Sequence, residues 1–418
     1  MKALAALAFL AAGLGIEASA QEAPSGTIPA PAERKRLLNF PDGPFDGLKN
    51  AGIDIKGSLA LTYGGLVSGD GAKDWRDGGR ADIWIGLDGE KLGLWDGFSV
   101  SIHPELVFGR STNRTGAGLL VPTNSLLAFP RLGKHDAEIS WVFNQTFSDT
   151  FSLSFGKFNM LDIAAQTPLV GGGGLETFMN TSIAAPIDGV TPPYVFGAIG
   201  SWKTAPAIYT LMIYDPRSAQ DWDVISDPFA DGVSYSLSAT IPTKLAGRTT
   251  FVTLRGVYSS ASGLDLDSVP DLLLPGQAAG ILRKEGYGYA SVSFQHYLAE
   301  DPARSGQGWG LFGDFGISDG NPNPIGWHAV LGIGGTGTAR DPYDRWGIAY
   351  FRNGISDDLV TGLAALGIGL RDEYGIEAYY NAALTPWLRL TADAQWIRPA
   401  NAGSDDALIL GLRLQSQF

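Results

Sequence analysis

The chain has 418 residues, no cysteine, and 43 acidic against 30 basic side chains, which gives a net charge of −13. The absence of cysteine excludes disulfides, zinc–thiolate sites and cysteine nucleophiles. The negative charge argues against a nucleic-acid partner, because binding a polyanion requires a positive surface. With 44% hydrophobic residues, the chain is too apolar to be disordered.

The first residues have the anatomy of a secretory signal peptide. Lys2 follows the initial methionine, residues 4–16 form an apolar run, and Ala18-Ser19-Ala20 is a small-residue cleavage site. We therefore predict a signal peptide over residues 1–20, and this run is too short to span a bilayer as a mature helix. No later stretch is apolar for about eighteen residues, which excludes a helical membrane protein.

Residues 21–52 precede the first regular pattern and are expected to form a short N-terminal periplasmic segment. Residues 21–36 are rich in Pro, Ala and charge, and indicate a mobile tail. Residues 37–52 are rich in turn formers, with one helical turn expected near residues 45–50 and packed against the main fold.

An alternation of apolar and polar residues begins at Ile53 and returns in short segments to the end of the chain. Period two over about ten residues is typical of a transmembrane β-strand that faces lipid on one side and water on the other. The sequence predicts sixteen strands at residues 53–63, 80–88, 98–108, 137–147, 151–158, 194–203, 208–215, 233–241, 249–258, 287–298, 309–316, 327–334, 346–352, 374–381, 388–397 and 408–418. We thus predict an all-β fold, a single antiparallel transmembrane β-barrel over residues 53–418.

The last two strands show the pattern most clearly. Leu390 and Trp396 alternate with Thr391 and Gln395, and the chain ends on Phe418. An edge strand of a soluble β-sandwich would give the same alternation. In the third strand, Pro104 falls in the apolar register and predicts a bulge or an edge irregularity.

The connections are expected to alternate in length. Residues 148–150, 203–207 and 242–247 form short turns that would face the periplasm, whereas residues 110–136, 159–193 and 259–286 form long loops. Loops longer than about fifteen residues are uncommon unless they are functional, so the long ones are candidates for a constriction of the lumen.

Five polar-side residues on the second and third strands suggest a path for sugars. A pyranose has one apolar face and a rim of hydroxyls, so a selective channel benefits from an aromatic ring beside charged groups. The candidates are Arg80, Asp82, Trp84, His103 and Glu105. In the alternative interpretation, Trp84 belongs to the interfacial girdle and the charges only solvate the lumen. Further polar-side residues are expected to line the lumen generally, namely Glu138, Asn144, Arg255, Asp314, Glu377, Asn381, Arg389, Asp393, Arg413 and Gln415.

Enzymatic signals are weak. The four histidines lie in separated segments without the HExxH spacing of a zinc protease, no Gly-x-Ser-x-Gly motif is present, and the glycines at 171–174 lack the Lys of a phosphate loop. A Ser/His hydrolase on a barrel remains an alternative, because triads assemble in space. We expect no enzyme, no cofactor and no metal.

Three stretches resemble the carbohydrate-selective outer-membrane porins of the OprB family. They are residues 88–97 (DGEKLGLWDG), residues 153–158, which end in Phe-Gly-Lys, and residues 377–398, with Tyr-Asn, Thr-Pro-Trp and Gln-x-Ile-x-Pro elements. The resemblance implies a sixteen-stranded barrel in the bacterial outer membrane that passes monosaccharides, glucose foremost, down their gradient. The entry at residues 39–48 departs from the family's N-terminal motif and keeps only its outline.

The expected function is therefore passive diffusion of sugars through a polar lumen. The expected partners are mono- or small oligosaccharides and outer-membrane lipids, and because general porins of this size are often trimers, a homotrimer is a further expectation. The alternatives are a pore for other small solutes such as organic acids, against which the acidic composition argues, or a secreted soluble β-rich sugar-binding protein.

Overall fold

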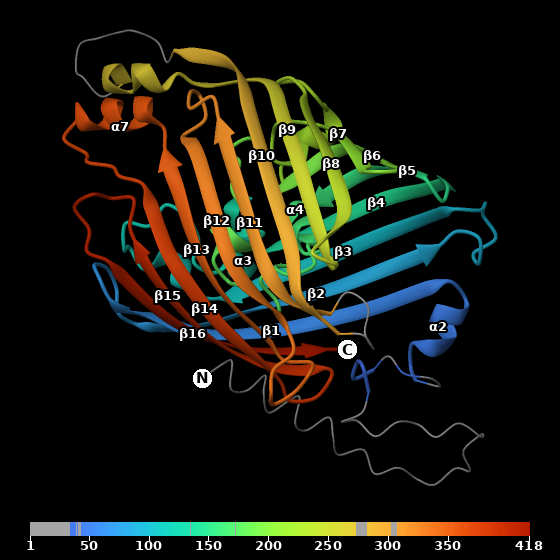
Figure 1. Ribbon diagram of the computed structural model, residues 1–418. Coiled ribbons are helices and arrows are strands. Elements are labelled where there is room, and N and C mark those ends of the chain that lie inside the picture. Colours follow the sequence, from blue (N-terminus) through green and yellow to red (C-terminus); the bar gives the residue numbers. More distant parts are fainter. Residues whose placement is uncertain are drawn as a thin grey trace.

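The computed structural model describes residues 34–418 except 39, 41–42, 134, 172, 273–281 and 302–306. The described residues form sixteen strands (Figure 1), namely β1 (Ile53–Ser68), β2 (Trp75–Asp88), β3 (Phe98–Gly109), β4 (Ala137–Ser148), β5 (Phe151–Asn159), β6 (Tyr194–Lys203), β7 (Ile208–Tyr214), β8 (Ser234–Leu245), β9 (Arg248–Leu264), β10 (Arg283–Glu300), β11 (Gly308–Ser318), β12 (Ile325–Thr336), β13 (Arg345–Ile355), β14 (Glu373–Ala383), β15 (Leu388–Arg398) and β16 (Ala407–Gln417). The predicted strand number is confirmed.

The strands close into one barrel. Each strand pairs with the next in antiparallel fashion, and β1 closes the ring by pairing with β16. At the seam, the backbone N–H of Gly57 donates to the carbonyl of Phe418 at 2.7 Å, and the N–H of Phe418 donates back to Gly57 at 2.9 Å. Closure leaves the sheet without an unpaired edge. A sheet can span the hydrocarbon core of a membrane only in this closed form, because its backbone polar groups must all be paired there.

The alternation predicted from the sequence matches the two faces of the wall. On β15 the outward Leu390 and Trp396 are 39% and 37% exposed, while the inward Thr391 and Gln395 are each 1% exposed. On β2, Ile83 likewise faces outward and is exposed, whereas Arg80 and Asp82 face inward and are buried. The many large apolar side chains that are exposed on the strands fit a lipid-facing surface.

The two ends of the barrel differ in their connections. At one end, the turn end, lie α2 (Asp46–Asn50), the C-terminus and short turns such as Ala246-Gly247. Both turn residues have positive φ, 50° and 77°, which suits the tight turn that joins twisted antiparallel strands. At the opposite end, the loop end, lie the long connections and α7 (Asp357–Ala364) (Figure 1).

Helices are few and short. Besides α2 and α7 there are α3 (Ser125–Ala128), α4 (Met160–Ala164), α5 (Thr181–Ala184) and α6 (Asp223–Ser226), with 3₁₀ turns η2 (Thr112–Arg114), η3 (Arg131–Gly133) and η4 (Leu266–Leu272). Across the described part of the chain, none of the helices has the length and hydropathy needed to cross a bilayer.

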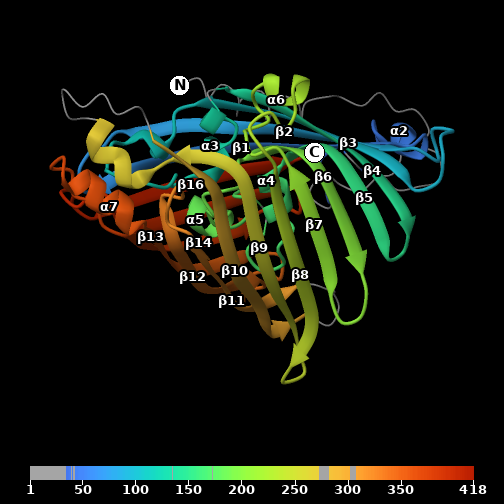
Figure 2. The same ribbon diagram turned by 90° about the horizontal axis from the view of Figure 1, so that it is seen from above.

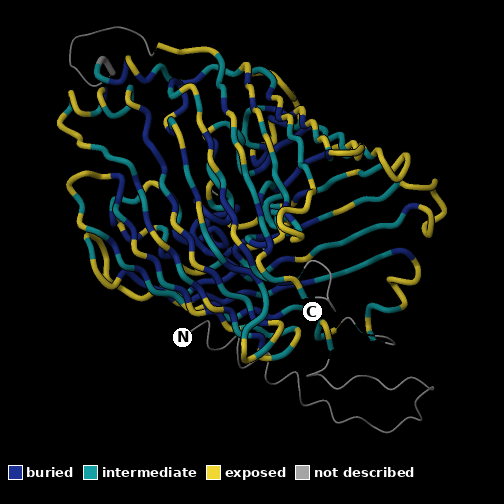
Figure 3. The backbone as a smooth tube through the Cα atoms, viewed as in Figure 1, coloured by how far each residue is buried: buried dark blue, intermediate teal, exposed yellow. Residues whose placement is uncertain are grey.

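Two long connections fold into the barrel. Figure 2 shows α3, α4 and α5 within the ring of strands, and Figure 3 shows buried backbone there, in contrast to the exposed turns. The 160–193 segment, between β5 and β6, inserts Phe178 between the rings of Phe312 and Tyr379, at 5.7 Å and 4.7 Å between centroids. The interior of the barrel therefore contains an apolar cluster as well as polar groups.

The structure differs from the sequence prediction at some boundaries. The predicted loop at residues 259–286 is too long, because β9 continues to Leu264 and β10 begins at Arg283. The sequence pattern missed these strand ends because apolar residues no longer alternate with polar ones there. The predicted turn at 242–247 is likewise too long, because Pro242 still pairs with Phe251. Pro104 causes no register shift in the pairing of β3 with β4, but the β2–β3 ladder has no pairs between Asp82–Glu105 and Ile85–Ile102, which agrees with the irregularity predicted there. The predicted signal peptide at 1–20 and the tail up to residue 33 lie outside the described residues.

Candidate functional site

Four ionisable side chains on the inward faces of β2 and β3 form a buried ionic cluster. Asp82 and Glu105 lie directly opposite each other in the β2–β3 pair. Arg80 bridges them, with Nε 2.7 Å from Asp82 Oδ1 and Nη2 2.8 Å from Glu105 Oε2. His103 adds its Nε2 at 3.0 Å from Asp82 Oδ1. Their exposed fractions are between 0% and 4%, so this ionic cluster belongs to the inner wall rather than to open water.

The ionic cluster also holds the start of the 160–193 segment. The Asn159 amide donates to Glu105 Oε2 at 2.8 Å. Asp162 on α4 lies with Oδ2 2.6 Å from His103 Nδ1. Hydrogen bonds that involve a charged group are the strong ones in a protein, so these two contacts fix where the segment enters the lumen.

Trp84 lies between the ionic cluster and a cavity of the lumen. Its ring stacks on the His103 imidazole with centroids 4.6 Å apart, and its side chain is half-buried. The structure therefore brings together all five residues that the sequence singled out, and of these five Trp84 alone lines the cavity described next. Their action as a constriction stays a prediction.

A cavity of about 460 Å³ lies inside the barrel near the turn end, and we call it the inner cavity. It is bounded by β1, β2, β13 and β16 and by the 160–193 segment, which closes it from one side. Its polar and aromatic lining comprises Arg36, Lys56, Ser58, Trp84, Gln166, Thr167, Glu176, Gln307, Arg345, Gln415 and Gln417. This volume falls within the roughly 300–1,000 Å³ of typical small-molecule sites.

Glu176 is the carboxylate that the 160–193 segment contributes to the inner cavity. Its Oε2 lies 3.2 Å from Arg345 Nη2 on β13, and its Oε1 accepts a hydrogen bond from the Gln417 amide at 2.5 Å. The cavity therefore presents an ion pair and amide groups beside the Trp84 ring.

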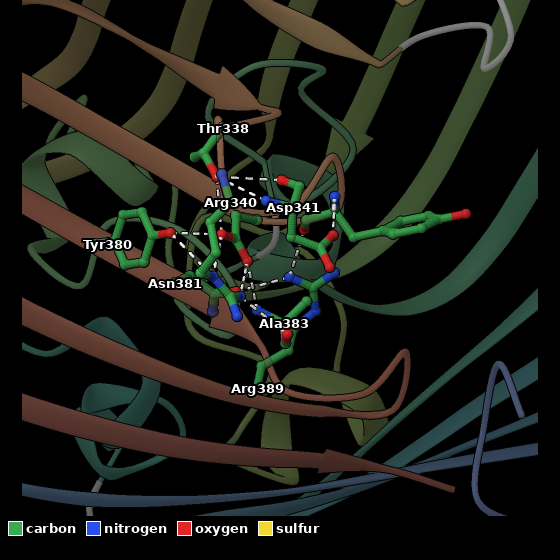
Figure 4. Close-up of polar contacts among 9 residues, drawn as sticks. Thr338, Arg340, Asp341, Tyr380, Asn381, Ala383 and Arg389 are labelled. Carbon is green, nitrogen blue, oxygen red and sulfur yellow. Dashed lines mark hydrogen bonds and ion pairs between the residues drawn. The ribbon is translucent and has the colours of Figure 1, made fainter. Parts of the chain in front are cut away.

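The turn between β12 and β13 helps to position Arg345 and Arg389 near this site, and Figure 4 shows the turn together with Arg389. Asp344, fully buried, accepts hydrogen bonds from Arg340 Nε at 2.7 Å and from the Ala383 N–H at 2.9 Å, and it also accepts from Tyr380. Burial alone would raise the pKa of Asp344, but these hydrogen bonds outweigh it and hold the pKa below its ordinary value. The next residue is Arg345, so the network fixes its backbone.

The same turn orients Arg389 on β15. Its Nη1 donates to the carbonyl of Tyr343 at 3.1 Å and to Asn381 Oδ1 at 2.7 Å. Figure 4 shows Arg389 beside Asn381 and the turn residues. The guanidinium is thus held against the wall by neutral acceptors.

Carboxylates of β14 hold both inward connections. Glu377 accepts from the backbone N–H of Asn180 at 3.0 Å and from that of Met179. Glu373 accepts from the N–H groups of Leu120 and Val121, at 2.6 Å and 3.0 Å. Each carboxylate therefore satisfies two amide donors of a buried loop, which would otherwise be left unpaired.

Two other predicted lumen residues also bind the 160–193 segment. Arg413 donates to the carbonyl of Thr177 at 2.9 Å, and Arg255 donates to Asp188 at 2.9 Å. Gln415 lines the inner cavity. Sequence reasoning missed Glu176 and Arg345, because one lies in an irregular loop and the other at a strand end.

Asp82, His103 and Glu105 bring one donor atom each within 4.8 Å of one another, as a metal site would. The donor set does not fit a cation, because Arg80 already lies between the two carboxylates and supplies the positive charge there.

A closed sixteen-stranded barrel with inward connections and a charged inner cavity defines the class of the porins. The model of the carbohydrate-selective porin family, OprB, matches residues 72–418, and the chain belongs to this family. Family and fold imply the bacterial outer membrane. A comparison with curated proteins gave no match.

Solved structures agree on the fold. The high-pH structure of Pseudomonas putida OprB superposes with a TM-score of 0.79 at 18% sequence identity, covering 93% of this chain and 99% of that one. Its low-pH structure gives a TM-score of 0.53 at 16% identity, with the same coverage. The predicted family and barrel are confirmed.

Proposed function

We propose that the inner cavity is the selective part of the sugar path, and that glucose-like monosaccharides diffuse through it passively and without chemical conversion. The observation that supports this most is the Trp84 ring, which lines a lumenal cavity together with charged and amide side chains. Membership of a carbohydrate-selective family gives the substrate class.

The chemistry of the lining suits a pyranose. The ring of Trp84 offers a surface for the apolar C–H face of a sugar. Glu176 and Arg345 offer an acceptor and a donor for neighbouring hydroxyls, and Gln415 and Gln417 offer both. Binding here is expected to be weak, because a conducting channel must release what it captures.

We assign the ionic cluster a supporting role in this path. The side chains of Arg80 and Glu105 are 2% and 0% exposed. They are therefore expected to act on the sugar through their neighbours, because Glu105 binds Arg80, Arg80 binds Asp82, and Asp82 in turn holds His103, on which Trp84 stacks.

Liposome swelling with a panel of monosaccharides and disaccharides tests the proposal. We expect glucose-sized monosaccharides to enter fastest, and disaccharides to enter more slowly than free diffusion predicts. Equal rates for charged organic acids and sugars of one size would contradict sugar selectivity.

The surroundings of the barrel are also proposed. The exposed apolar side chains of the outer wall support contact with outer-membrane lipids, and we propose a homotrimer by analogy with general porins of this size. Sedimentation in detergent would distinguish a trimer from a monomer.

A further inference from the structure

A second cavity, of about 290 Å³, lies at the loop end and thus at the opposite end of the barrel from the inner cavity. We call it the outer cavity. It is enclosed by the ends of β9 and β10, by the connection between β7 and β8, and by the end of the 160–193 segment. The lining residues that matter here are Gly189, Arg217, Asp231, Ser262, Arg283 and Tyr287.

Arg217 is fixed in place before any ligand arrives. Its Nε and Nη2 donate to the two oxygens of Asp215 at 3.0 Å and 2.7 Å, and Nη2 also donates to the Asp227 carbonyl at 2.7 Å. This bidentate pairing sets the plane of the guanidinium. One wall of the outer cavity is therefore a rigid cation.

Two further charged groups on the outer cavity can form hydrogen bonds with sugar hydroxyls. The Asp231 carboxylate is 68% exposed, and its Oδ2 lies 3.8 Å from Arg217 Nε, which is an ion-pair distance too long for a hydrogen bond. Arg283 uses Nε and Nη2 on Ser262, at 2.8 Å and 2.5 Å. An exposed carboxylate and a guanidinium edge on one cavity can accept from and donate to adjacent sugar hydroxyls.

The aromatic surface comes from Tyr287. It pairs with Ser259 across β9 and β10, at a register shift next to Glu285. A Cβ at Gly263 would lie 2.0 Å from the Tyr287 hydroxyl, so a side chain at residue 263 would displace the phenol from its place against the strand. The ring is thereby held on the cavity wall.

The floor of the outer cavity is rigid as well. Gly189 has a φ of 69°, and a Cβ there would meet Asn323 at 2.0 Å. The preceding Asp188 accepts from Arg255 at 2.9 Å, and its carbonyl accepts from Asn323 at 2.8 Å. A site that is ordered in advance loses little entropy on binding.

We propose that the outer cavity is a second sugar subsite, which captures a monosaccharide at the loop end before it reaches the inner cavity. Tyr287 stacks on the ring of the sugar, and Asp231 and Arg283 bind its hydroxyls. The inference rests on the proposed function, since it concerns the same substrate class. Two weak subsites in series favour entry without trapping.

Single-channel recording with glucose on one side at a time tests this subsite. We expect Tyr287→Ala and Asp231→Asn each to lower the association rate several-fold for glucose added at the loop end, with the rate from the turn end unchanged. Tyr287→Trp should keep a near-normal rate, because it retains a ring. Since the chain has no cysteine, Lys244→Cys and a membrane-impermeant thiol reagent identify the turn end.

Tyr258→Ala is the matched control, because Tyr258 neighbours Ser259 on β9 and its side chain points outward, 56% exposed. It should leave both rates unchanged. An unchanged loop-end rate in Tyr287→Ala, or an equal fall from both sides, would overturn the outer subsite while glucose block of the wild type still supports the inner cavity.

Saturation-transfer NMR of glucose with the protein in detergent gives an independent readout. We expect Trp84→Ala to keep part of the transfer signal and Trp84→Ala/Tyr287→Ala to lose it. Equal signals in the two variants would refute the outer subsite, and a full signal in Trp84→Ala alone would instead argue against the inner cavity.

Discussion

The indole of Trp84 stacks on the imidazole of His103, with 4.6 Å between centroids and 27° between planes. The two ring nitrogens of His103 lie within hydrogen-bond distance of Asp82 and Asp162. A ring that lines the inner cavity is thus braced through a histidine by the buried Asp82 and by Asp162, whose side chain is 36% exposed. The rigidity of the proposed stacking surface follows from this arrangement.

Trp84→Ala is expected to weaken glucose block of the ion current. Aromatic stacking contributes about 0.5–1.5 kcal/mol, so the affinity should fall roughly two- to tenfold. Planar-bilayer recordings at several glucose concentrations measure it. Trp396→Ala is the control, because Trp396 faces outward on β15. Unchanged block in Trp84→Ala would remove Trp84 from the path.

Alanine at Arg80 or at Glu105 should weaken both the barrel and sugar block. Each change leaves a buried charge without its partner, which costs about 3–5 kcal/mol, and loss of Glu105 also frees Asn159. The temperature at which the folded gel band disappears reports stability, and bilayer recording reports block. The double variant Arg80→Met/Glu105→Gln should recover part of the stability. Normal block in both single variants would exclude a role for the ionic cluster in selectivity.

Glu377→Gln is expected to loosen the 160–193 segment. The neutral amide accepts the Met179 and Asn180 N–H groups more weakly than the carboxylate does. We predict a larger and noisier single-channel conductance. Glu373→Gln is the companion variant, since it acts on the 110–136 segment instead. Identical conductance in wild type and Glu377→Gln would show that this anchor does not set the open area.

Asp344 predicts a dependence of stability on pH. Because its folded pKa lies below the ordinary value, its contribution is complete above the pKa of an unfolded aspartate, about 3.9, and is lost as the pH falls toward the folded pKa. Asp344→Asn should therefore be less stable than wild type at pH 7, and the difference should shrink in acid. Thermal unfolding in detergent at pH 7 and pH 3 checks this. A difference that grew on acidification would contradict the assignment.

The charge of the inner cavity predicts its ion preference. Among the described residues, Arg36, Lys56 and Arg345 line it together with one carboxylate, that of Glu176, although the whole chain carries −13. Lys56 is paired with Asp54 at 2.5 Å, so the local excess is small. We expect reversal potentials in a KCl gradient to show a mild preference for chloride, reduced in Arg345→Gln. A strong preference for cations would contradict an ion path through the inner cavity.

The period-two pattern, together with the predicted signal peptide and the family resemblance, led to the prediction of the barrel. Lipid outside and polar groups inside impose opposite requirements on successive residues, so Trp396 and Gln395 show in the sequence which face each occupies. The same pattern placed Arg80, Asp82, Trp84, His103 and Glu105 on one inner face, because neighbouring strands share their register.

The path of the inward connections could be decided only by the tertiary structure. Glu373 binds amides 253 and 252 residues away, and Glu176 meets Arg345 across the lumen. No local periodicity encodes such contacts, because an irregular loop reaches its place through hydrogen bonds and packing with distant strands. The sequence determined the wall of this protein, and three-dimensional packing determined what fills it and where the cavities remain.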